Sequence, residues 1–363
     1  MNARFPRRHA ISLIASAPFL LREQARAASK EIDESGFVPI GGIDQWISIH
    51  GRDGVNPAIL YLHGGPGEAQ SPFPEHFVPW ESDFTVVNWD QRGAGKTFGR
   101  NGGASTPGMS TPESAFDRMC QDVREVAEHA CSRLKQKKVV LVGQSWGTQL
   151  GFASIMRWPQ LFHAFVGTAH YVSWPESIRG QESWKREQAV AANDQETIVA
   201  LDKVAQLPLT DFKRYRTGNK YRFGPSDLEY IKSMSTFTGP PPPPEQGDVA
   251  DWFGGMDFSS PRLGPIISSY DARKFGLDIP IPFFVIQGRD DHVTPFEVAE
   301  RYVAQVRAPV KKFIPIGGGH FACFTHSAAF AGALRQHVRP VMKTMRWAGS
   351  AGLAAGQSSG WGQ

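Results

Sequence analysis

The sequence predicts an α/β fold: a mostly parallel sheet with helices on both faces and an inserted helical cap. Short runs of β-branched and aromatic residues alternate with longer helical patterns, which is typical of this fold class. Most of the runs are apolar throughout, as strands covered on both faces are. The alternation stops near residue 170 and resumes near residue 278. Residues 171–277 are therefore predicted to form the cap, and residues 28–170 and 278–345 the two parts of the core.

The strands are predicted from their apolar runs and the turns that bound them. The first, at residues 46–51, is expected to be antiparallel to the others. The inner strands are predicted at residues 58–64, 84–90, 138–143 and 164–169, and the closing strands at residues 282–288 and 311–317. One long helix is expected to start near Ser110–Glu113, where a hydroxyl, an early proline and a first-turn carboxylate favour a helix N-terminus. Its apolar positions recur every three or four residues, so one face packs on the sheet.

The first 27 residues have the three regions of an export signal. A basic start, RFPRRH, precedes an apolar stretch, AISLIASAPFLL, and a small-residue ending, ARAAS, with cleavage expected after Ala27. Arg7 and Arg8 resemble a twin-arginine signal. The predicted location is therefore periplasmic or secreted. The alternative is an amphipathic extension on a cytoplasmic enzyme, because the apolar stretch is too short to span a bilayer.

The net charge of +4 comes from the leader, because the rest of the chain has 34 basic and 34 acidic residues. This balance predicts no nucleic-acid or anionic-membrane partner, and no later segment is long enough to span a membrane. The three cysteines, an odd number, argue against a disulfide framework. Cys120 and Cys131 would lie roughly 16 Å apart on one helix, beyond disulfide reach. Together with Cys323, they are interpreted as packing residues.

Two segments have a biased composition. The stretch GPPPPPEQG at 239–247 is interpreted as a stiff connector within the cap, and a proline-rich ligand for a partner protein is the competing interpretation. The tail at 346–363 is rich in Gly, Ala and Ser and is expected to be disordered.

The stretch DQRGAGKT at 90–97 follows a predicted strand and looks like a phosphate-binding loop. A P-loop requires glycine five residues before its Gly-Lys pair, and that position is Asp90. A carboxylate there would repel phosphate, so no nucleotide site is predicted.

A candidate nucleophile lies where the strand at 138–143 leads into Gly143-Gln144-Ser145-Trp146-Gly147 and then a helical run. In a nucleophile elbow, flanking glycines leave room for a strained strand-to-helix turn that projects the serine hydroxyl from the sheet. A serine hydroxyl needs a histidine to take its proton and a carboxylate to hold that histidine. The sequence therefore needs both groups at the same sheet edge.

The acid and the histidine are predicted after the last two strands, at the edge where α/β active sites assemble. GRDDHVTP offers Asp290 and Asp291, and GGGH offers His320. Asp291 is favoured because the acid usually lies three residues beyond the loop glycine. His63 and His292 show no metal-ligand spacing and are interpreted as structural.

Acyl transfer also needs donors for the oxygen that becomes negative. The HGGPG loop at 63–67 supplies backbone N–H groups near the serine. Gly65 and Trp146 are the predicted oxyanion-hole residues; an ordinary turn is the alternative interpretation of this loop.

These motifs, HGGPG, DQRGAGKT, GQSWGTQLG, GRDDHVTP and GGGH, resemble the proline iminopeptidase family of α/β hydrolases in order and spacing, over residues 40–335. The resemblance implies an α/β-hydrolase fold with Ser145 as nucleophile, Asp291 as acid, His320 as base, and Gly65 and Trp146 as oxyanion donors. It also implies that DQRGAGKT supports the active-site edge. Family peptidases bind the substrate's amino terminus with acidic residues, including one shortly after the histidine. Here the segment FACFTHSAAF, which follows His320, has no carboxylate. The cap offers Glu176, Glu182 and Glu187 as carboxylates for this role.

The predicted function is a serine hydrolase that releases N-terminal proline, or another small residue, from short peptides through an acyl-enzyme. It would need no metal or cofactor. The alternative is an esterase or amidase on small acyl substrates with the same triad. A binding protein that keeps the scaffold without catalysis is a third hypothesis, against which the intact Ser, Asp and His argue.

Overall fold

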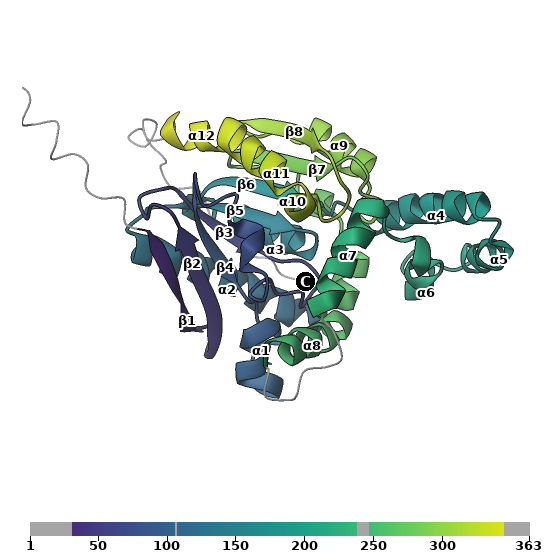
Figure 1. The fold of residues 1–363 in the computed structure, drawn as a ribbon, viewed down its shortest axis with the longest axis horizontal. Coiled ribbons are helices and arrows are strands. Elements are labelled where there is room, and N and C mark those ends of the chain that lie inside the picture. Colours follow the sequence, from purple (N-terminus) through teal and green to yellow (C-terminus); the bar gives the residue numbers. More distant parts are fainter. Residues whose placement is uncertain (1–30, 106, 238–246, 345–363) are drawn as a thin grey trace, which may run out of the picture.

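The computed structural model describes residues 31–105, 107–237 and 247–344 (Figure 1). The predicted leader, residues 239–246 of the proline-rich stretch and the predicted tail lie outside the described residues. Within the described ranges, no helix is both long and apolar enough to cross a membrane.

The described residues form one eight-stranded sheet in the order β1-β2-β4-β3-β5-β6-β7-β8. Strands β3 to β8 run parallel, and β1 and β2 are antiparallel to their neighbours. The strand bounds are Ile32–Ile40, Ile43–Gly51, Ala58–Leu62, Thr85–Trp89, Val139–Gln144, Phe162–Thr168, Phe283–Gly288 and Lys311–Ile316. This confirms the predicted fold class, including the antiparallel strand at 46–51.

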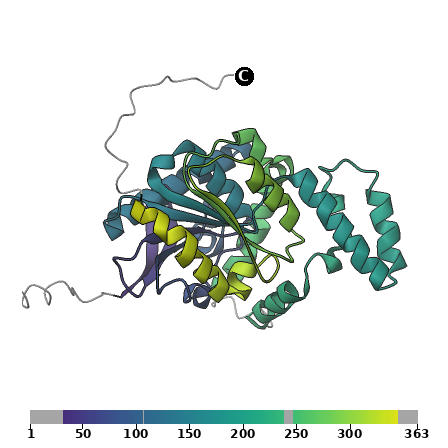
Figure 2. The ribbon, with the colours of Figure 1, turned by 90° about the horizontal axis from the view of Figure 1, so that it is seen from above.

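Helices cover both faces of the sheet, as Figure 2 shows from above. Because side chains alternate along a strand, Leu60 and Leu62 of β3 join one buried cluster, and Ile59 and Tyr61 join another. The first cluster includes α2 (Pro112–Leu134), α3 (Trp146–Arg157) and α9 (Phe296–Gln305). The second includes α10 (Ala322–Thr325), α11 (Ser327–Ala333), the π-helical turn Leu334–Val338 and α12 (Arg339–Thr344).

Helix α2 begins where its sequence predicts. Thr111 accepts a hydrogen bond from the backbone N–H of Ser114, whose hydroxyl in turn accepts from the Thr111 N–H. This reciprocal cap satisfies two groups that a helix start otherwise leaves unpaired. Cys120 and Cys131 both lie in α2 and are free thiols, as is Cys323.

Strand β1 was not predicted. Its sequence, IDESGFVPI, contains two acids, a glycine and a proline, which are rare in strands. The strand nevertheless forms nine residue pairs with β2, which compensate for this unfavourable composition. Its side chains alternate between more and less exposed positions, and such a pattern suffices because an edge strand needs only one apolar face. Gly41 and Gly42 join the two strands with φ of +56° and +79°, which suits a two-residue hairpin turn.

Five α-helices lie between β6 and β7 in the described chain. They are α4 (Trp174–Ala191), α5 (Gln195–Val204), α6 (Phe212–Arg216), α7 (Pro225–Phe237) and α8 (Gly247–Ser269). We call this set the cap helices. Figure 1 shows α4, α5 and α6 extending away from the sheet, while α7 and α8 lie nearer the core. Helix α8 packs on α1 (Gly95–Asn101) and α2, and α7 packs on α10.

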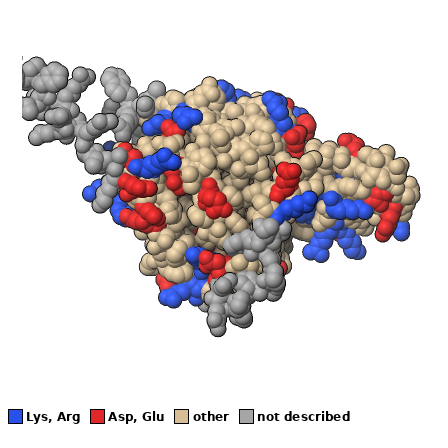
Figure 3. Space-filling view, viewed as in Figure 1, with Lys and Arg blue, Asp and Glu red and all other residues tan. Residues whose placement is uncertain are grey.

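Charged side chains of both signs are interspersed over the core on the face shown in Figure 3, and Lys and Arg gather around α6. Inside the cap, buried Lys185 donates hydrogen bonds to the carbonyls of Tyr215 (2.8 Å) and Thr217 (3.0 Å). Burial and the nearby Arg222 lower the pKa of Lys185 to about 8. Arg214 of α6 forms a two-pronged ion pair with Glu182 of α4. These bonds hold α6 against α4.

A buried ion pair joins the DQRGAGKT loop to α2. The Arg92 guanidinium binds both carboxylate oxygens of Asp122, at 2.8 and 3.0 Å, and both side chains are fully buried. Arg92 also donates to the Gly41 carbonyl at 2.8 Å. The pair thereby connects the β1–β2 hairpin, the loop after β4 and α2.

Removing one partner of this pair is expected to destabilise the fold strongly. Asp122→Ala leaves the Arg92 charge buried without its carboxylate, which costs about 3 to 5 kcal/mol in free energy of unfolding. The measurement is equilibrium denaturation in urea. Asp278→Ala is the matched control, because its pair with Arg307 is solvent-exposed and should contribute little. Equal losses in the two variants would contradict the expectation.

Candidate active site

Ser145 occupies a tight turn between β5 and α3. Its φ of +52° is unusual for a residue with a side chain and marks a strained backbone. A Cβ on Gly143 would lie 2.5 Å from the Gly147 carbonyl oxygen, and one on Gly147 would lie 2.1 Å from the Leu62 carbonyl oxygen. Only glycine fits at both positions, so the sequence around Ser145 satisfies the steric demand of a nucleophile elbow.

The structure brings Ser145, His320 and Asp291 together. His320 Nε2 lies 3.1 Å from Ser145 Oγ, and His320 Nδ1 lies 3.1 Å from Asp291 Oδ1. Asp291 and His320 follow β7 and β8, the last two strands of the sheet. Asp290 is exposed to solvent and has no contact with the histidine ring among the described interactions.

Asp291 is held by several donors. It accepts hydrogen bonds from the backbone N–H groups of Val293 and Thr294, from the Thr294 hydroxyl and from the Gln287 amide, at 2.6 to 3.0 Å. These bonds orient a carboxylate that is only 1% exposed. The oriented carboxylate can in turn hold His320 with Nδ1 protonated and Nε2 free to accept the serine proton.

The charge environment favours protonation of His320. Burial by itself would lower the pKa of His320, but the charge and hydrogen bond of Asp291 raise it, and Asp227 and Glu68 raise it further. The net result is a pKa above the ordinary value of 6.5. Such a histidine is well suited to take a proton from a hydroxyl and give it to a leaving group.

Two carboxylates near His320 were missed by sequence reasoning. Buried Asp227, from cap helix α7, accepts hydrogen bonds from the backbone N–H groups of His320 (2.9 Å) and Phe321 (3.1 Å). Glu68 follows the HGGPG loop directly, and burial raises its pKa to about 7, while the charge of His320 opposes that rise. The position of Glu68 beside a predicted motif could have pointed to it. No sequence signal links Asp227 to a loop 93 residues away.

The three cap carboxylates noted in the sequence have other partners. Glu176 pairs with Arg273 and Arg301, Glu182 pairs with Arg214, and Glu187 accepts from the Ser183 hydroxyl. None of the three lies among the described residues that line the cavity beside Ser145.

Gly65 and Trp146 both line a cavity that Ser145 also lines. Trp146 is the first residue of α3, where N–H groups have no partner within the helix and the helix dipole favours negative charge. Gly65, with φ of +103°, lies in the loop after β3. The HGGPG loop and the start of α3 thus both bring backbone N–H groups to the sheet edge at which Ser145 lies.

The DQRGAGKT loop supports this edge. The Gln91 amide donates to the His63 carbonyl (2.9 Å) and accepts from the Trp146 indole (3.1 Å), so it ties the HGGPG loop to α3. Burial lowers the pKa of His63 to about 4, which keeps its Nε2 as an acceptor for the Gln91 N–H. The Asp90 carboxylate accepts from the Lys96 N–H and the Ser71 hydroxyl. It therefore occupies the start of α1, where a P-loop would hold phosphate.

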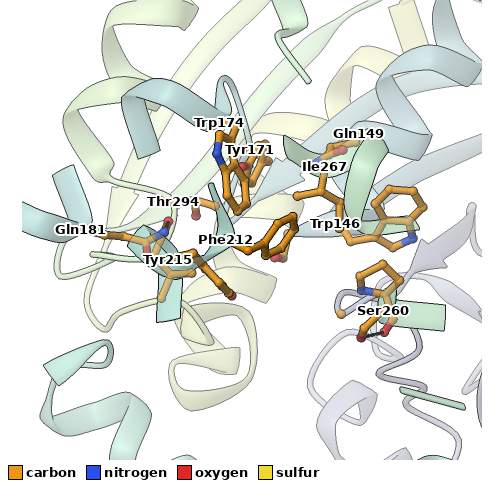
Figure 4. A pocket seen from close by; sticks show the side chains of 15 residues that line it. Trp146, Gln149, Tyr171, Trp174, Gln181, Phe212, Tyr215, Ser260, Ile267 and Thr294 are labelled. Carbon is orange, nitrogen blue, oxygen red and sulfur yellow. Dashed lines mark hydrogen bonds between the residues drawn. The ribbon is translucent and has the colours of Figure 1, made fainter. Parts of the chain in front are cut away.

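The cavity beside Ser145 has a volume of about 140 Å³ (Figure 4). Aromatic side chains from the cap and the loop after β6 form much of its wall: Tyr171, Trp174, Phe212 and Tyr215. Helix α8 adds Ser260, Gly264 and Ile267. None of the described residues that line it is charged. The cavity therefore suits an uncharged, largely apolar group.

Comparison with known proteins identifies the family. A model of the alpha/beta hydrolase fold family matches residues 57–327, so this chain belongs to that family. A protein of Bacillus subtilis strain 168 named as a probable aminopeptidase is 25% identical over 311 residues, covering 83% of this chain and 94% of its own. A proline iminopeptidase of Neisseria meningitidis serogroup A is 29% identical over 139 residues, 38% of this chain and 40% of its own.

Solved structures show the same fold. A proline iminopeptidase-related protein from Thermus thermophilus superimposes with a TM-score of 0.57 at 19% identity, covering 86% of this chain and 99% of its own. The proline iminopeptidase of Mycobacterium smegmatis gives the same score and identity, with 86% and 100% covered. These comparisons confirm the resemblance that the motifs indicate; at this identity, the structural likeness shows the fold alone.

The bond from Asp227 to the histidine loop yields a test of the electrostatics. Asp227→Asn keeps an acceptor oxygen but removes the negative charge, so the pKa of His320 is expected to fall. The measurement is an NMR titration of the imidazole rings, with His320→Gln to identify the signal.

Glu187→Gln is the control, because this exposed carboxylate pairs with Ser183 and should leave the titration unchanged. An unchanged or raised pKa of His320 in Asp227→Asn would contradict the expectation.

Proposed function

We propose that this member of the α/β hydrolase family is a serine hydrolase that releases N-terminal proline, or another small residue, from short peptides. The observation that carries the proposal is the chain of contacts from Ser145 through His320 to Asp291, with 3.1 Å at each step. Those contacts can turn a weakly nucleophilic hydroxyl into a reactive one.

The reaction would proceed by acyl transfer. His320 Nε2 takes the Ser145 proton while Oγ attacks the carbonyl carbon, and the N–H groups of Gly65 and Trp146 bind the oxygen that becomes negative. The protonated His320 then gives its proton to the leaving amine. Water, deprotonated by the same histidine, releases the acyl group and restores Ser145.

The aminopeptidase assignment has two further supports. The relative that aligns over most of this chain is named as a probable aminopeptidase. Glu68 supplies a carboxylate close enough to His320 for their charges to interact, on the loop that also carries Gly65. A carboxylate in that place could bind the α-ammonium group of a peptide.

A second candidate, an esterase or amidase acting on small neutral acyl groups, is favoured by one observation. The cavity beside Ser145 has no charged side chain among the described residues that line it. Such a site does not by itself demand a substrate with a free amino group.

Replacing the proposed nucleophile tests the mechanism. Ser145→Ala is expected to lower kcat on aminoacyl arylamides by at least about 10⁴-fold, because no other group replaces the hydroxyl. A fluorophosphonate probe should label the wild-type protein and leave Ser145→Ala unlabelled. The substrate panel comprises prolyl and alanyl arylamides beside short acyl esters. Ester turnover without any arylamide turnover would remove the peptidase assignment, and unlabelled wild-type protein would remove the mechanism.

Glu68 offers a separate test of amino-group binding. Glu68→Gln should reduce kcat/KM for alanyl arylamide by about 10 to 100-fold more than for a short acyl ester, because only the first carries an ammonium group, whereas the effect of Glu68 on the pKa of His320 is common to both substrates. The assay is best run near pH 7.5, since the pKa of Glu68 is about 7 and that of an α-amino group is about 8. Both groups are then substantially charged.

Glu75→Gln is the control, an exposed carboxylate seven residues along the same segment. Equal losses on amide and ester in Glu68→Gln would show a structural effect and count against amino-group binding.

A further inference from the structure

One polar side chain in the wall of the cavity lacks the partners that its burial demands. Gln149 of α3 is 0% exposed, and neither its Oε1 nor its Nε2 has a hydrogen-bond partner in the described chain. A buried amide without partners is destabilising, and almost all such groups in folded proteins are bonded. Gln149 lines the same cavity as Ser145, four residues further along the turn and α3. The cavity is thus the place from which a partner can come.

A second amide in the wall is half satisfied. Gln181 of α4 is also buried, and its Nε2 donates to the Val293 carbonyl at 2.8 Å. This bond fixes the orientation of the amide, and its Oε1 has no partner among the described residues. The two glutamines in the cavity wall therefore have, between them, two amide oxygens and one amide N–H₂ group without a partner among the described residues, and aromatic side chains line much of the rest of the wall.

The aromatic part of the wall is held by a hydrogen bond and by ring packing. The Trp174 indole donates to the Leu209 carbonyl at 2.7 Å, and its ring lies 5.0 Å from Phe212 and 5.4 Å from Tyr215, centre to centre. The contacts of α6 with Lys185 and Glu182 hold Phe212 and Tyr215 in place. Figure 4 shows these rings between Gln181 on one side and Gln149 on the other. A ring or branched chain can pack against such surfaces.

We infer that Gln149 and Gln181 select an uncharged group that combines an apolar body with a hydroxyl. A hydroxyl can donate to Gln149 Oε1 and accept from Gln149 Nε2, which satisfies both atoms at once. A purely apolar group leaves both amides unpaired, and a carboxylate in this uncharged wall has no cation to balance it.

The selected group belongs to the acyl part of the substrate, a step that rests on the proposed function. His320 gives its proton to the leaving group, so the leaving group lies on the side of the histidine. The cavity is lined by Ser145, Gly65 and Trp146, and His320 is not among its lining residues. The cavity therefore receives the group on the other side of the scissile bond.

Binding to Ser145→Ala tests the selection without any catalysis. The probes are phenylacetamide, 4-hydroxyphenylacetamide and 4-carboxyphenylacetamide, and the readout is calorimetry. The hydroxyl compound is expected to bind about 10-fold more tightly than phenylacetamide, and the carboxylate at least about 10-fold more weakly. Equal or tighter binding of phenylacetamide, or tighter binding of the carboxylate, would overturn the inference.

Variants assign the selection to the amides. Adding Gln149→Met to Ser145→Ala should bring the hydroxyl compound within about 2-fold of phenylacetamide, because an unbranched side chain of similar length offers no amide. Gln195→Met, at an exposed position of α5, is the matched control and should preserve the preference. A preference that survives Gln149→Met would overturn the role of Gln149. If Gln149→Met does not fold, Gln181→Met and the ligand series on Ser145→Ala still decide the selection.

Turnover of two esters tests whether the selected group lies on the acyl side of the scissile bond. For wild-type protein, kcat/KM for 4-nitrophenyl 4-hydroxyphenylacetate should exceed that for 4-nitrophenyl phenylacetate by the same factor as in binding. Equal values despite a binding preference would overturn the acyl-side assignment. If the wild-type protein cleaves no ester or arylamide while Ser145→Ala shows the preference, the proposed function fails and the selectivity of the cavity stands.

Discussion

The active-site edge depends on a steric constraint at one turn. Ser145 can take its unusual backbone conformation only because Gly143 and Gly147 leave room where a Cβ would strike a carbonyl oxygen. That conformation ends β5, starts α3 and exposes the serine hydroxyl at the carboxyl edge of the parallel strands. The loops after β3, β4, β7 and β8 reach the same edge. These loops carry Gly65, Gln91, Asp291 and His320, respectively, which surround or support that hydroxyl.

Charge is distributed unevenly around Ser145. On one side, His320 is surrounded by Asp291, Asp227 and Glu68, which together raise its pKa in spite of burial. On the other side, the described wall of the cavity has aromatic rings and neutral amides. In the proposed mechanism, proton transfer and binding of the substrate's ammonium group take place on the charged side, and the uncharged part of the acyl group is recognised on the neutral side. This separation keeps the buried carboxylates away from the apolar part of the substrate, next to which an unpaired charge would be costly.

Much of the fold and of the proposed site could be predicted from the sequence, because both depend on local patterns. Buried parallel strands are continuous apolar runs, and the serine turn requires glycines at fixed positions. Strand β1 could not be predicted, because its pairing with β2 outweighs an unfavourable composition. Asp227 and Gln149 could not be predicted either. Asp227 contacts the loop that carries His320, and Gln149 lines the cavity beside Ser145. Both relations arise from the folded structure, and short motifs do not encode them.

The contact between Asp227 and the histidine loop has a consequence for how this scaffold can diversify. Helices α4, α6 and α8 of the cap line the cavity beside Ser145, and α7 of the same cap supplies the carboxylate that binds the backbone N–H groups of His320 and Phe321. Recognition and reactivity are thus built into one continuous piece of the molecule. Grafting the cap of a relative onto this core would change more than a binding surface. The grafted cap must also supply a hydrogen-bond acceptor, as Asp227 does, for the N–H groups of His320 and Phe321. A change of cap that preserves these two bonds must therefore keep the start of α7 in place relative to the loop after β8.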